Sequence, residues 1–423
     1  MSKLALAMIV KGDAEEAKLL DRCLKSLDGH VDAMYITGTY TKDVSETKEV
    51  ERIAKKHGAV FSSFQWVKHF AKARNYNFSQ VPKEYEYILW CDADDVWEGA
   101  EMLKKVVENY PMVDAIAFWY LYDFDEYKKP TVVHKKTQIV RNDGCVEWAG
   151  ELHEDFKENR SINVYFSEDA RRIHLTDNKR AISARDRNVE IATDGVKMNP
   201  EDPRTHWNLA NSYVAKEEFD KARVEFDIFL KKSSSLDEKY IAMMRLADIE
   251  DAIGNKTRAL ELLWMAIGMK PDLSDAFYRT GQLHFKHREW KDAEKYTKMG
   301  LILKPQYHQF IVYNPRDYDY NPMMLLAKIF MQMGRPDNAI PMLEGCLELS
   351  PKEKHLQKLI DELKVQRDYL HQAVEFVARY ENEPDDVLKK AYEELDDVLK
   401  AHPAIVIPRN QRFIKKATSG KDI

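Results

Sequence analysis

The second half of the chain repeats a helical pattern with a period of about 34 residues, and this repeat restricts the fold more than any other feature. Each period spaces small alanines between large aliphatic and aromatic residues. Most periods end in Lys-Pro or Ser-Pro, and the four begin near Trp207, Ala242, Phe277 and Met323. The pattern predicts paired helices stacked into a short solenoid over residues 203–355, in preference to an irregular helical bundle.

The first period shows which repeat this is. Its Trp207, Tyr213, Phe219, Ala222 and Phe226 stand at spacings that resemble the tetratricopeptide repeat. The resemblance implies an extended concave surface that suits peptides. An insertion at 306–320, rich in tyrosine, separates the third and fourth periods. We expect it either to line a binding face or to pack against the N-terminal domain.

The first 175 or so residues follow a different pattern, in which short apolar strands alternate with helical segments. Strands are expected at 4–10, 33–37, 59–64, 87–91 and 115–120, and helices at 14–27, 45–57 and 100–110. This alternation predicts an α/β domain with a mainly parallel sheet. Because such sheets bind ligands beyond the carboxyl ends of their strands, residues following Val10, Ile36 and Cys91 are expected on one rim.

The length of the chain indicates how many domains it has, and its net charge bears on nucleic-acid binding. A chain of 423 residues suggests two or three domains. We expect a sheet domain at 1–178, a linker helix at 179–202, the repeats at 203–355, and charged helices with a basic tail at 356–423. The charged helices are candidates for a homodimer contact. A net charge of −6 gives no global basic excess of the kind typical of nucleic-acid binding.

The cysteines and the N-terminus indicate the compartment. The four cysteines are widely spaced and form no disulfide framework, which indicates a reducing environment. The apolar run Leu4–Val10 is too short for a membrane span and lacks a signal-peptide cleavage site. We therefore expect a cytoplasmic protein without a membrane span.

An acidic cluster marks the expected rim. The apolar run Tyr87–Cys91 leads directly into Asp92, Asp94 and Asp95. Carboxylates at the end of a strand are oxygen ligands for a divalent cation bound to phosphates. A charged turn or a helix cap explains an isolated Asp-Ala-Asp equally well, so its place after a fourth apolar strand is what makes it informative.

Six segments, in order, resemble the family 2, GT-A-fold glycosyltransferases. They are Met8–Asp13, Tyr35–Asp43, Phe64–Asn75, the acidic cluster, Ile139–Asp155 and Arg172–Leu175. Together with the repeats, they resemble the sublancin-type peptide S-glycosyltransferases. The resemblance implies a Rossmann-like GT-A domain, an Mn²⁺ or Mg²⁺ cofactor, and a sugar donor that is a nucleotide diphosphate.

The resemblance also implies site residues. Asp94 and His174 are the expected metal ligands. Thr37 stands where the family carries a base-reading Asp. The residues expected along the nucleotide-sugar are Val10, Lys11, Gly12, Thr37, Lys72, Arg74, Asp92, Ala93, Arg141 and Trp148. Arg74 is favoured as a phosphate contact at a helix start. For the base that takes the acceptor proton, Glu154 comes first and Asp155 second, and His153 stays open.

These features favour a metal-dependent inverting glycosyltransferase that moves a hexose or pentose to a peptide or protein acceptor through Ser, Thr or Cys. One alternative is an acceptor on a modified nucleic-acid base or on a glycan. Another is an inactive GT-A domain joined to a repeat-based binding adaptor, for which the departures at Gly12, Asp13 and Thr37 are the motivation.

Overall fold

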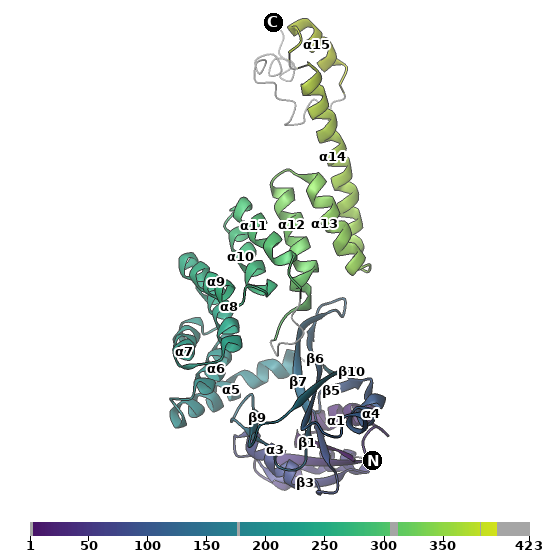
Figure 1. Cartoon of the computed structure of the whole chain (residues 1–423), viewed down its shortest axis with the longest axis vertical. Coiled ribbons are helices and arrows are strands. Elements are labelled where there is room, and N and C mark those ends of the chain that lie inside the picture. Colours follow the sequence, from purple (N-terminus) through teal and green to yellow (C-terminus); the bar gives the residue numbers. More distant parts are fainter. Residues whose placement is uncertain (1–2, 176–177, 305–311, 381, 396–423) are drawn as a thin grey trace. The chain divides into compact units, whose positions relative to one another are not determined.

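The computed structural model describes residues 3–175, 178–304, 312–380 and 382–395. It falls into two compact units, residues 1–283 with 299–318 and residues 284–298 with 319–423 (Figure 1). Residues 306–311 of the expected insertion and the basic tail from 396 onward lie outside the described residues.

An eight-stranded sheet forms the centre of the N-terminal domain, in the order β3-β2-β1-β4-β7-β6-β10-β5. The strands are β1 (Leu4–Lys11), β2 (Ala33–Tyr40), β3 (Val60–Gln65), β4 (Tyr87–Trp90), β5 (Asp95–Glu98), β6 (Ala115–Phe124), β7 (Pro130–Arg141) and β10 (Val164–His174). Four of the seven neighbouring pairs are parallel, and the pairs that involve β7 or β5 are antiparallel. The sheet is thus mostly parallel, as the alternation predicts. A small second sheet pairs β8 (Val146–Ala149) with β9 (Asp155–Glu158).

Helices cover both faces of the main sheet, because alternate residues of each strand point to opposite sides. Leu4, Leu6 and Met8 of β1 pack with α1 (Ala14–Ser26), α2 (Lys48–Lys56) and α4 (Leu103–Asn109). Short 3₁₀ turns, η1 (Val44–Thr47) and η2 (Ala100–Met102), precede α2 and α4. The alanines between those β1 residues, Ala5 and Ala7, lie in the core of the other face, with α3 (Phe70–Ser79) and β9 packed against it.

The sheet has its topological switch point between β1 and β4, since β2 and β3 extend the sheet from one side of β1 and β4 lies on the other. Ligands of open α/β sheets bind outside the carboxyl ends of the strands at such a point. Gly12, just beyond β1, fits tightly there, because a Cβ atom would lie 2.9 Å from the carbonyl oxygen of Thr39. The loop after β1 therefore packs directly on the end of β2.

Helices make up the rest of the described chain. After α5 (Asn178–Met198), the chain forms two helices within each of the four predicted periods: α6 (Pro203–Ala215) and α7 (Phe219–Lys232), α8 (Leu236–Ala252) and α9 (Lys256–Met269), α10 (Ser274–Lys286) and α11 (Trp290–Leu301), and α12 (Tyr320–Gln332) and α13 (Pro336–Leu349). The turn η3 (Pro315–Tyr318) precedes α12, and α14 (Lys354–Tyr380) and α15 (Asp385–Glu393) end the described part. None of the described helices is both long enough and apolar enough to cross a bilayer.

The described part of the insertion packs on the sheet domain. Tyr313 forms an antiparallel bridge with Val133 of β7, and its ring centroid lies 6.3 Å from that of Trp119. Arg316 forms an ion pair with Asp125. Of the two expectations for this segment, packing against the first domain is the one that these residues follow.

Replacing Phe226 by Ala tests the repeat core. Phe226 of α7 is fully buried among Ala210, Ala222 and Ala242, so the change leaves a cavity and is expected to cost about 3–5 kcal/mol of stability. Urea unfolding followed by circular dichroism measures it. Val224 on the same helix is 56% exposed, and Val224→Ala should stay within about 0.5 kcal/mol of the wild type. Equal costs for the two variants would contradict the repeat packing.

Candidate functional site

The acidic cluster forms a tight turn between β4 and β5, and Asp95 holds the turn together. Asp95 is fully buried. Its carboxylate accepts hydrogen bonds from the backbone amide of Asp92 (2.8 Å), from Nε of Arg172 (2.6 Å) and from the hydroxyl of Tyr120 (3.1 Å). The sequence assigned no role to Asp95, although its place in the acidic cluster was a visible signal.

Asp94 and His174, the two predicted metal ligands, meet at this turn. Nδ1 of His174 lies 3.7 Å from Oδ1 of Asp94 and 3.2 Å from Oδ1 of Asp95. One donor atom from each of the three side chains lies within 4.8 Å of the others. The backbone amide of Leu175 donates to the carbonyl of Asp94 (3.0 Å) and so joins the end of β10 to the turn.

The surroundings of His174 orient its ring. The ring stacks on Tyr122 with centroids 4.6 Å apart and planes 5° from parallel. Burial disfavours the charged imidazole, but the Asp95 and Asp94 carboxylates outweigh it and raise the pKa of His174 above its usual value. Two carboxylates and an imidazole are a donor set that accepts Mn²⁺. Asp94, Asp95 and His174 form the candidate cation site, and Asp95 is in addition bound by Arg172.

Arg172 is the residue that sequence reasoning missed. It is fully buried, and its guanidinium lies over the rings of Trp90 (4.6 Å) and Tyr120 (4.3 Å). Besides Asp95, it binds Oδ2 of Asp92 through Nη2 at 2.6 Å. The available signal was its position two residues before His174 on one strand, which places both side chains on the same face.

Arg74 joins the two sides of the site. Its Nη2 donates to Oδ1 of Asp92 (2.7 Å) and its Nε to Oε1 of Glu154 (2.5 Å). The side chain is 6% exposed, and its guanidinium lies 4.9 Å from the ring centre of Trp90 and 5.0 Å from that of Trp148. Burial opposes its charge, but the two carboxylates prevail and raise its pKa.

This arrangement corrects the expectation that Arg74 lies at a helix start, whereas its contact with phosphate stays a prediction. Helix α3 begins at Phe70 and is capped by His69, so Arg74 lies past the first turn, beyond the free backbone amides. Its guanidinium is bound by two carboxylates. Lys72 is exposed, and residues two apart on a helix do not face each other, so Lys72 does not join Arg74.

The loop between β8 and β9 carries His153 and Glu154, two of the three candidate bases, and two helices hold it, whereas Asp155 is the first residue of β9. Backbone amides of Phe70 and Ala71 in α3 donate to the carbonyls of Glu151 (3.0 Å) and Gly150 (3.3 Å). From α6, Nδ2 of Asn208 donates to the carbonyl of Leu152 at 2.7 Å. The loop is thus fixed from both sides.

Glu154 is the candidate base that the structure places in the charge network. Its side chain is 9% exposed and bound to Arg74. Asp155 is instead 59% exposed and pairs with Lys136 at 3.2 Å. His153 is exposed and adopts a positive φ of 51°. Of the three predicted bases, Glu154 alone contacts the Arg74–Asp92 pair.

Thr37 does not have the predicted position. Strand β2 continues to Tyr40, so Thr37 lies inside the strand and is fully buried. Its hydroxyl lies 2.8 Å from that of Ser62 and accepts a hydrogen bond from Nδ2 of Asn77 (2.9 Å). A side chain in this position has no surface to offer a nucleotide base, which corrects the base-reading assignment.

Arg141 lies at the wrong end of the sheet for a donor contact. It pairs in register with Tyr87, the first residue of β4, whereas the acidic turn follows the last. Its guanidinium donates to the hydroxyl of Tyr87 (2.7 Å) and the carbonyl of Val113 (3.1 Å). Its contacts support the structure there and lie away from the acidic turn.

Most of the other residues that we predict to contact the nucleotide-sugar donor could do so only through their main-chain atoms. Val10 and Ala93 are buried in the apolar core, so their main-chain atoms are the groups left for a ligand. The side chain of Lys11 is exposed and pairs with Asp13 at 2.8 Å. Trp148 is 3% exposed and packs edge-to-face on Trp90, so it shapes the site through Arg74.

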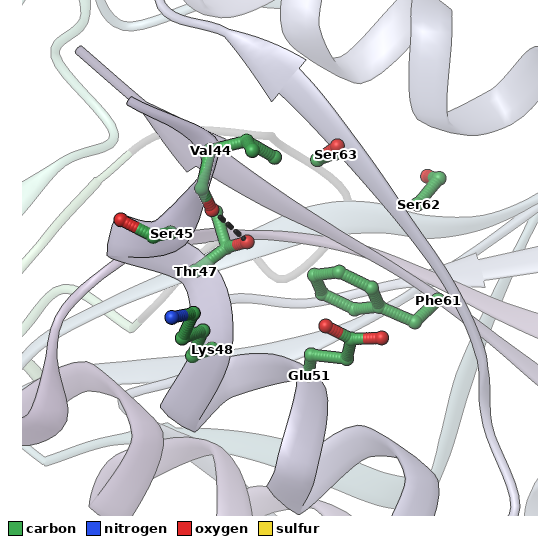
Figure 2. Close-up of a pocket in the computed structure, with 8 residues that line it drawn as sticks. All are labelled: Val44, Ser45, Thr47, Lys48, Glu51, Phe61, Ser62 and Ser63. Carbon is green, nitrogen blue, oxygen red and sulfur yellow. Dashed lines mark hydrogen bonds between the residues drawn. The ribbon is translucent and has the colours of Figure 1, made fainter. Parts of the chain in front are cut away.

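A separate hollow of about 310 Å³ lies beside the edge strand β3 (Figure 2). It is lined by Val44, Ser45, Thr47, Lys48, Glu51, Phe61, Ser62 and Ser63. The hydroxyl of Thr47 is bonded to the carbonyl of Val44 at 2.8 Å (Figure 2). None of the predicted site residues lines this hollow, so we assign it no part in the chemistry of the acidic turn.

Comparisons with known proteins identify the repeats. Residues 207–274 and 320–353 match family models of the tetratricopeptide repeat. A TPR repeat-containing protein of Synechococcus elongatus is 28% identical over 118 residues, which cover 28% of this chain and 27% of that protein. The chain therefore matches about a quarter of the length of this relative. The helical part is thus a tetratricopeptide-type solenoid.

Solved structures of repeat proteins also align with part of this chain. MamA is 18% identical and aligns with 43% of this chain and 99% of its own, with a TM-score of 0.35. A thermophilic TPR protein of Thermus thermophilus is 19% identical over 44% of this chain and 94% of its own, with a TM-score of 0.32. These likenesses concern the fold alone.

Substituting Arg172 tests the charge network. Arg172→Met leaves Asp92 and Asp95 without their shared cation, so we expect a loss of about 3–5 kcal/mol of stability in urea unfolding. The neighbouring Arg171 forms an exposed pair with Glu98, and Arg171→Met should cost about 0–1 kcal/mol. If both variants unfold at the wild-type urea concentration, the network does not hold the acidic turn.

Proposed function

We propose that this protein is a metal-dependent inverting glycosyltransferase that moves a sugar from a nucleotide-diphosphate donor to a peptide or protein acceptor. The observation that carries the proposal is the meeting of Asp94 and His174 at 3.7 Å, on the rim where the switch-point strands end. Glu154, a candidate base, belongs to the same charge network through Arg74.

Each group has a definable task in this reaction. Asp94 and His174 would hold Mn²⁺ or Mg²⁺, and the cation would offset the charge that develops on the departing nucleotide diphosphate. Glu154 takes the proton of the acceptor hydroxyl or thiol as the acceptor oxygen or sulfur bonds to the anomeric carbon and the bond to the diphosphate breaks. Arg74 keeps Glu154 and Asp92 in one fixed geometry.

The repeats favour a peptide or protein as the acceptor, because tetratricopeptide arrays form extended concave surfaces. The first repeat also reaches the site. Asn208 of α6 binds the carbonyl of Leu152, and Nη2 of Arg204 binds the carbonyl of His153 at 3.2 Å. A polypeptide bound along α6 would therefore lie beside the loop that carries Glu154.

The second candidate function is a binding adaptor without enzyme activity. The matched repeats favour it, and the buried network around Asp95 stabilises the fold whether or not chemistry occurs there. The two candidates differ in whether the acidic turn binds a nucleotide sugar in the presence of a divalent cation.

Release of nucleotide diphosphate distinguishes the two functions. The purified protein with Mn²⁺ should hydrolyse at least one common sugar nucleotide, with water replacing the acceptor. Asp94→Asn and His174→Gln should each slow this release by about 100-fold or more, because charge stabilisation at the leaving group is lost. Asp123→Asn, an exposed carboxylate on β6, is the matched control and should leave the rate unchanged. If the wild type releases no nucleotide diphosphate and no donor raises its melting temperature, the adaptor function stands instead.

The variant Glu154→Gln tests whether Glu154 acts as the base without a role in binding the donor. Glutamine keeps the size of the side chain but cannot take a proton, so donor hydrolysis should fall by about 10²–10⁴-fold. The shift in melting temperature that the donor and Mn²⁺ produce should persist. Asp155→Asn is the matched control and should retain most of the activity. The reverse ranking of the two variants would make Asp155 the base.

A further inference from the structure

One histidine of the sheet domain has ring nitrogens without a hydrogen-bond partner. His134 lies on β7, directly opposite Tyr120 of β6, and the two ring centres are 5.2 Å apart. Its side chain is half-buried. Within the ranges that the structure describes, neither ring nitrogen of His134 forms a hydrogen bond, and neither is sealed from solvent. The ring therefore has a packing partner, while its nitrogens remain available to a ligand.

Tyr120 connects His134 to the acidic turn. The hydroxyl of Tyr120 donates to Oδ1 of Asp95 at 3.1 Å, and the guanidinium of Arg172 lies 4.3 Å from the centre of its ring. The ring of Tyr120 also lies 6.2 Å from that of His174. Only one aromatic side chain thus separates His134 from the residues of the candidate cation site.

Lys136 connects His134 to the other side of the site. The two residues alternate along β7, so their side chains point to the same face of the strand. Nζ of Lys136 donates to Oδ1 of Asp155 at 3.2 Å, and Asp155 directly follows Glu154. His134 therefore neighbours both the acidic turn and the segment that carries the candidate bases.

The charges around His134 keep its imidazole neutral. Burial, and after it the positive charges of Lys136 and Arg172, lower the pKa of His134 to about 3, against the opposing effect of Asp155. A neutral imidazole has one nitrogen that donates a hydrogen bond and one that accepts. A hydroxyl group can also do both, so it matches either nitrogen, whereas an anion matches only the donor.

The reaction proposed above brings hydroxyl groups to this region. The anomeric carbon is bonded to the diphosphate that the cation would hold, and the acceptor deprotonated by Glu154 attacks the same carbon. The sugar ring must therefore lie between the acidic turn and the loop of Glu154. We propose that His134 hydrogen-bonds a hydroxyl of the transferred sugar and so contributes to the choice of donor. This inference rests on the proposed function, because a protein that binds no nucleotide sugar cannot make the contact.

Donor hydrolysis by His134→Phe tests the contact. Phenylalanine keeps a ring against Tyr120 but cannot form the hydrogen bond. The donor is the one that the wild type hydrolyses best among UDP-glucose, UDP-N-acetylglucosamine, GDP-mannose and dTDP-glucose, each with Mn²⁺. We expect kcat/KM to fall about tenfold, which corresponds to about 1.4 kcal/mol. The inhibition constant of the matching nucleoside diphosphate should stay within about twofold, because that molecule carries no transferred sugar.

Donors that lack one hydroxyl identify the group that His134 binds. Deoxy analogues of the same nucleotide sugar are compared with the parent donor in each protein, so that their intrinsic reactivity cancels between proteins. The wild type should discriminate against one analogue about tenfold more than His134→Phe does, because the variant has no contact left to lose. His134→Gln, which can still donate and accept, should recover part of this discrimination.

His30→Phe is the matched control. His30 lies two residues before Asp32, whose backbone amide donates to the carbonyl of Leu4 at the start of β1, whereas the acidic turn follows the end of the parallel strand β4. The same substitution at His30 should therefore leave kcat/KM and the discrimination among deoxy donors unchanged.

Three results would overturn the inference. One is wild-type discrimination among the deoxy donors by His134→Phe. Another is equal weakening of the donor and of the nucleoside diphosphate, which would mean that His134 supports the acidic turn through Tyr120. In both cases the wild type still cleaves a nucleotide sugar, so the proposed function survives. The third is a wild type that hydrolyses none of the donors, and the proposed function then fails as well.

Discussion

The two oxygens of Asp92 bind two different buried guanidiniums, and the geometry of the site depends on this bridge. Arg74 reaches Asp92 from α3 and Arg172 reaches it from β10. Removing charges from water is costly, and the structure offsets the cost by hydrogen-bonding each one and by placing the guanidiniums against Trp90. Elements distant in the sequence are thereby joined at one point.

The network contains cationic groups besides its two central arginines. Arg74 and Arg172 face the carboxylates of Asp92, Asp95 and Glu154. At the side of the turn that carries Asp94 lie His174, whose pKa the Asp95 and Asp94 carboxylates raise, and Arg22, whose Nη2 donates to the carbonyl of Asp94 at 3.4 Å. A divalent cation at that position would reduce the mutual repulsion of the carboxylates, whereas a free anion would increase it.

Local sequence patterns predicted much of this fold, because they depend on nearby residues. The helical spacing of the repeats predicts their helices, and apolar runs such as Tyr87–Cys91 predict buried strands, without any knowledge of distant residues. The pairing of Asp94 with His174 was expected from a motif order and not from geometry. What the sequence did not reveal depends on long-range pairing. The extension of β2 past Thr37 buries that side chain, and the antiparallel register of β7 against β4 takes Arg141 to the far end of the sheet.

The loop with Glu154 depends on both the sheet domain and the first repeat. Its carbonyls accept hydrogen bonds from the start of α3 and from Asn208, and Leu152 packs in an apolar cluster with Ile191 of α5 and Leu209 of α6. A loop held from one side alone would retain the freedom to turn its carboxylate away from Arg74. Because α6 supplies the second support, the position of the loop that carries Glu154 depends on the first repeat as well as on α3.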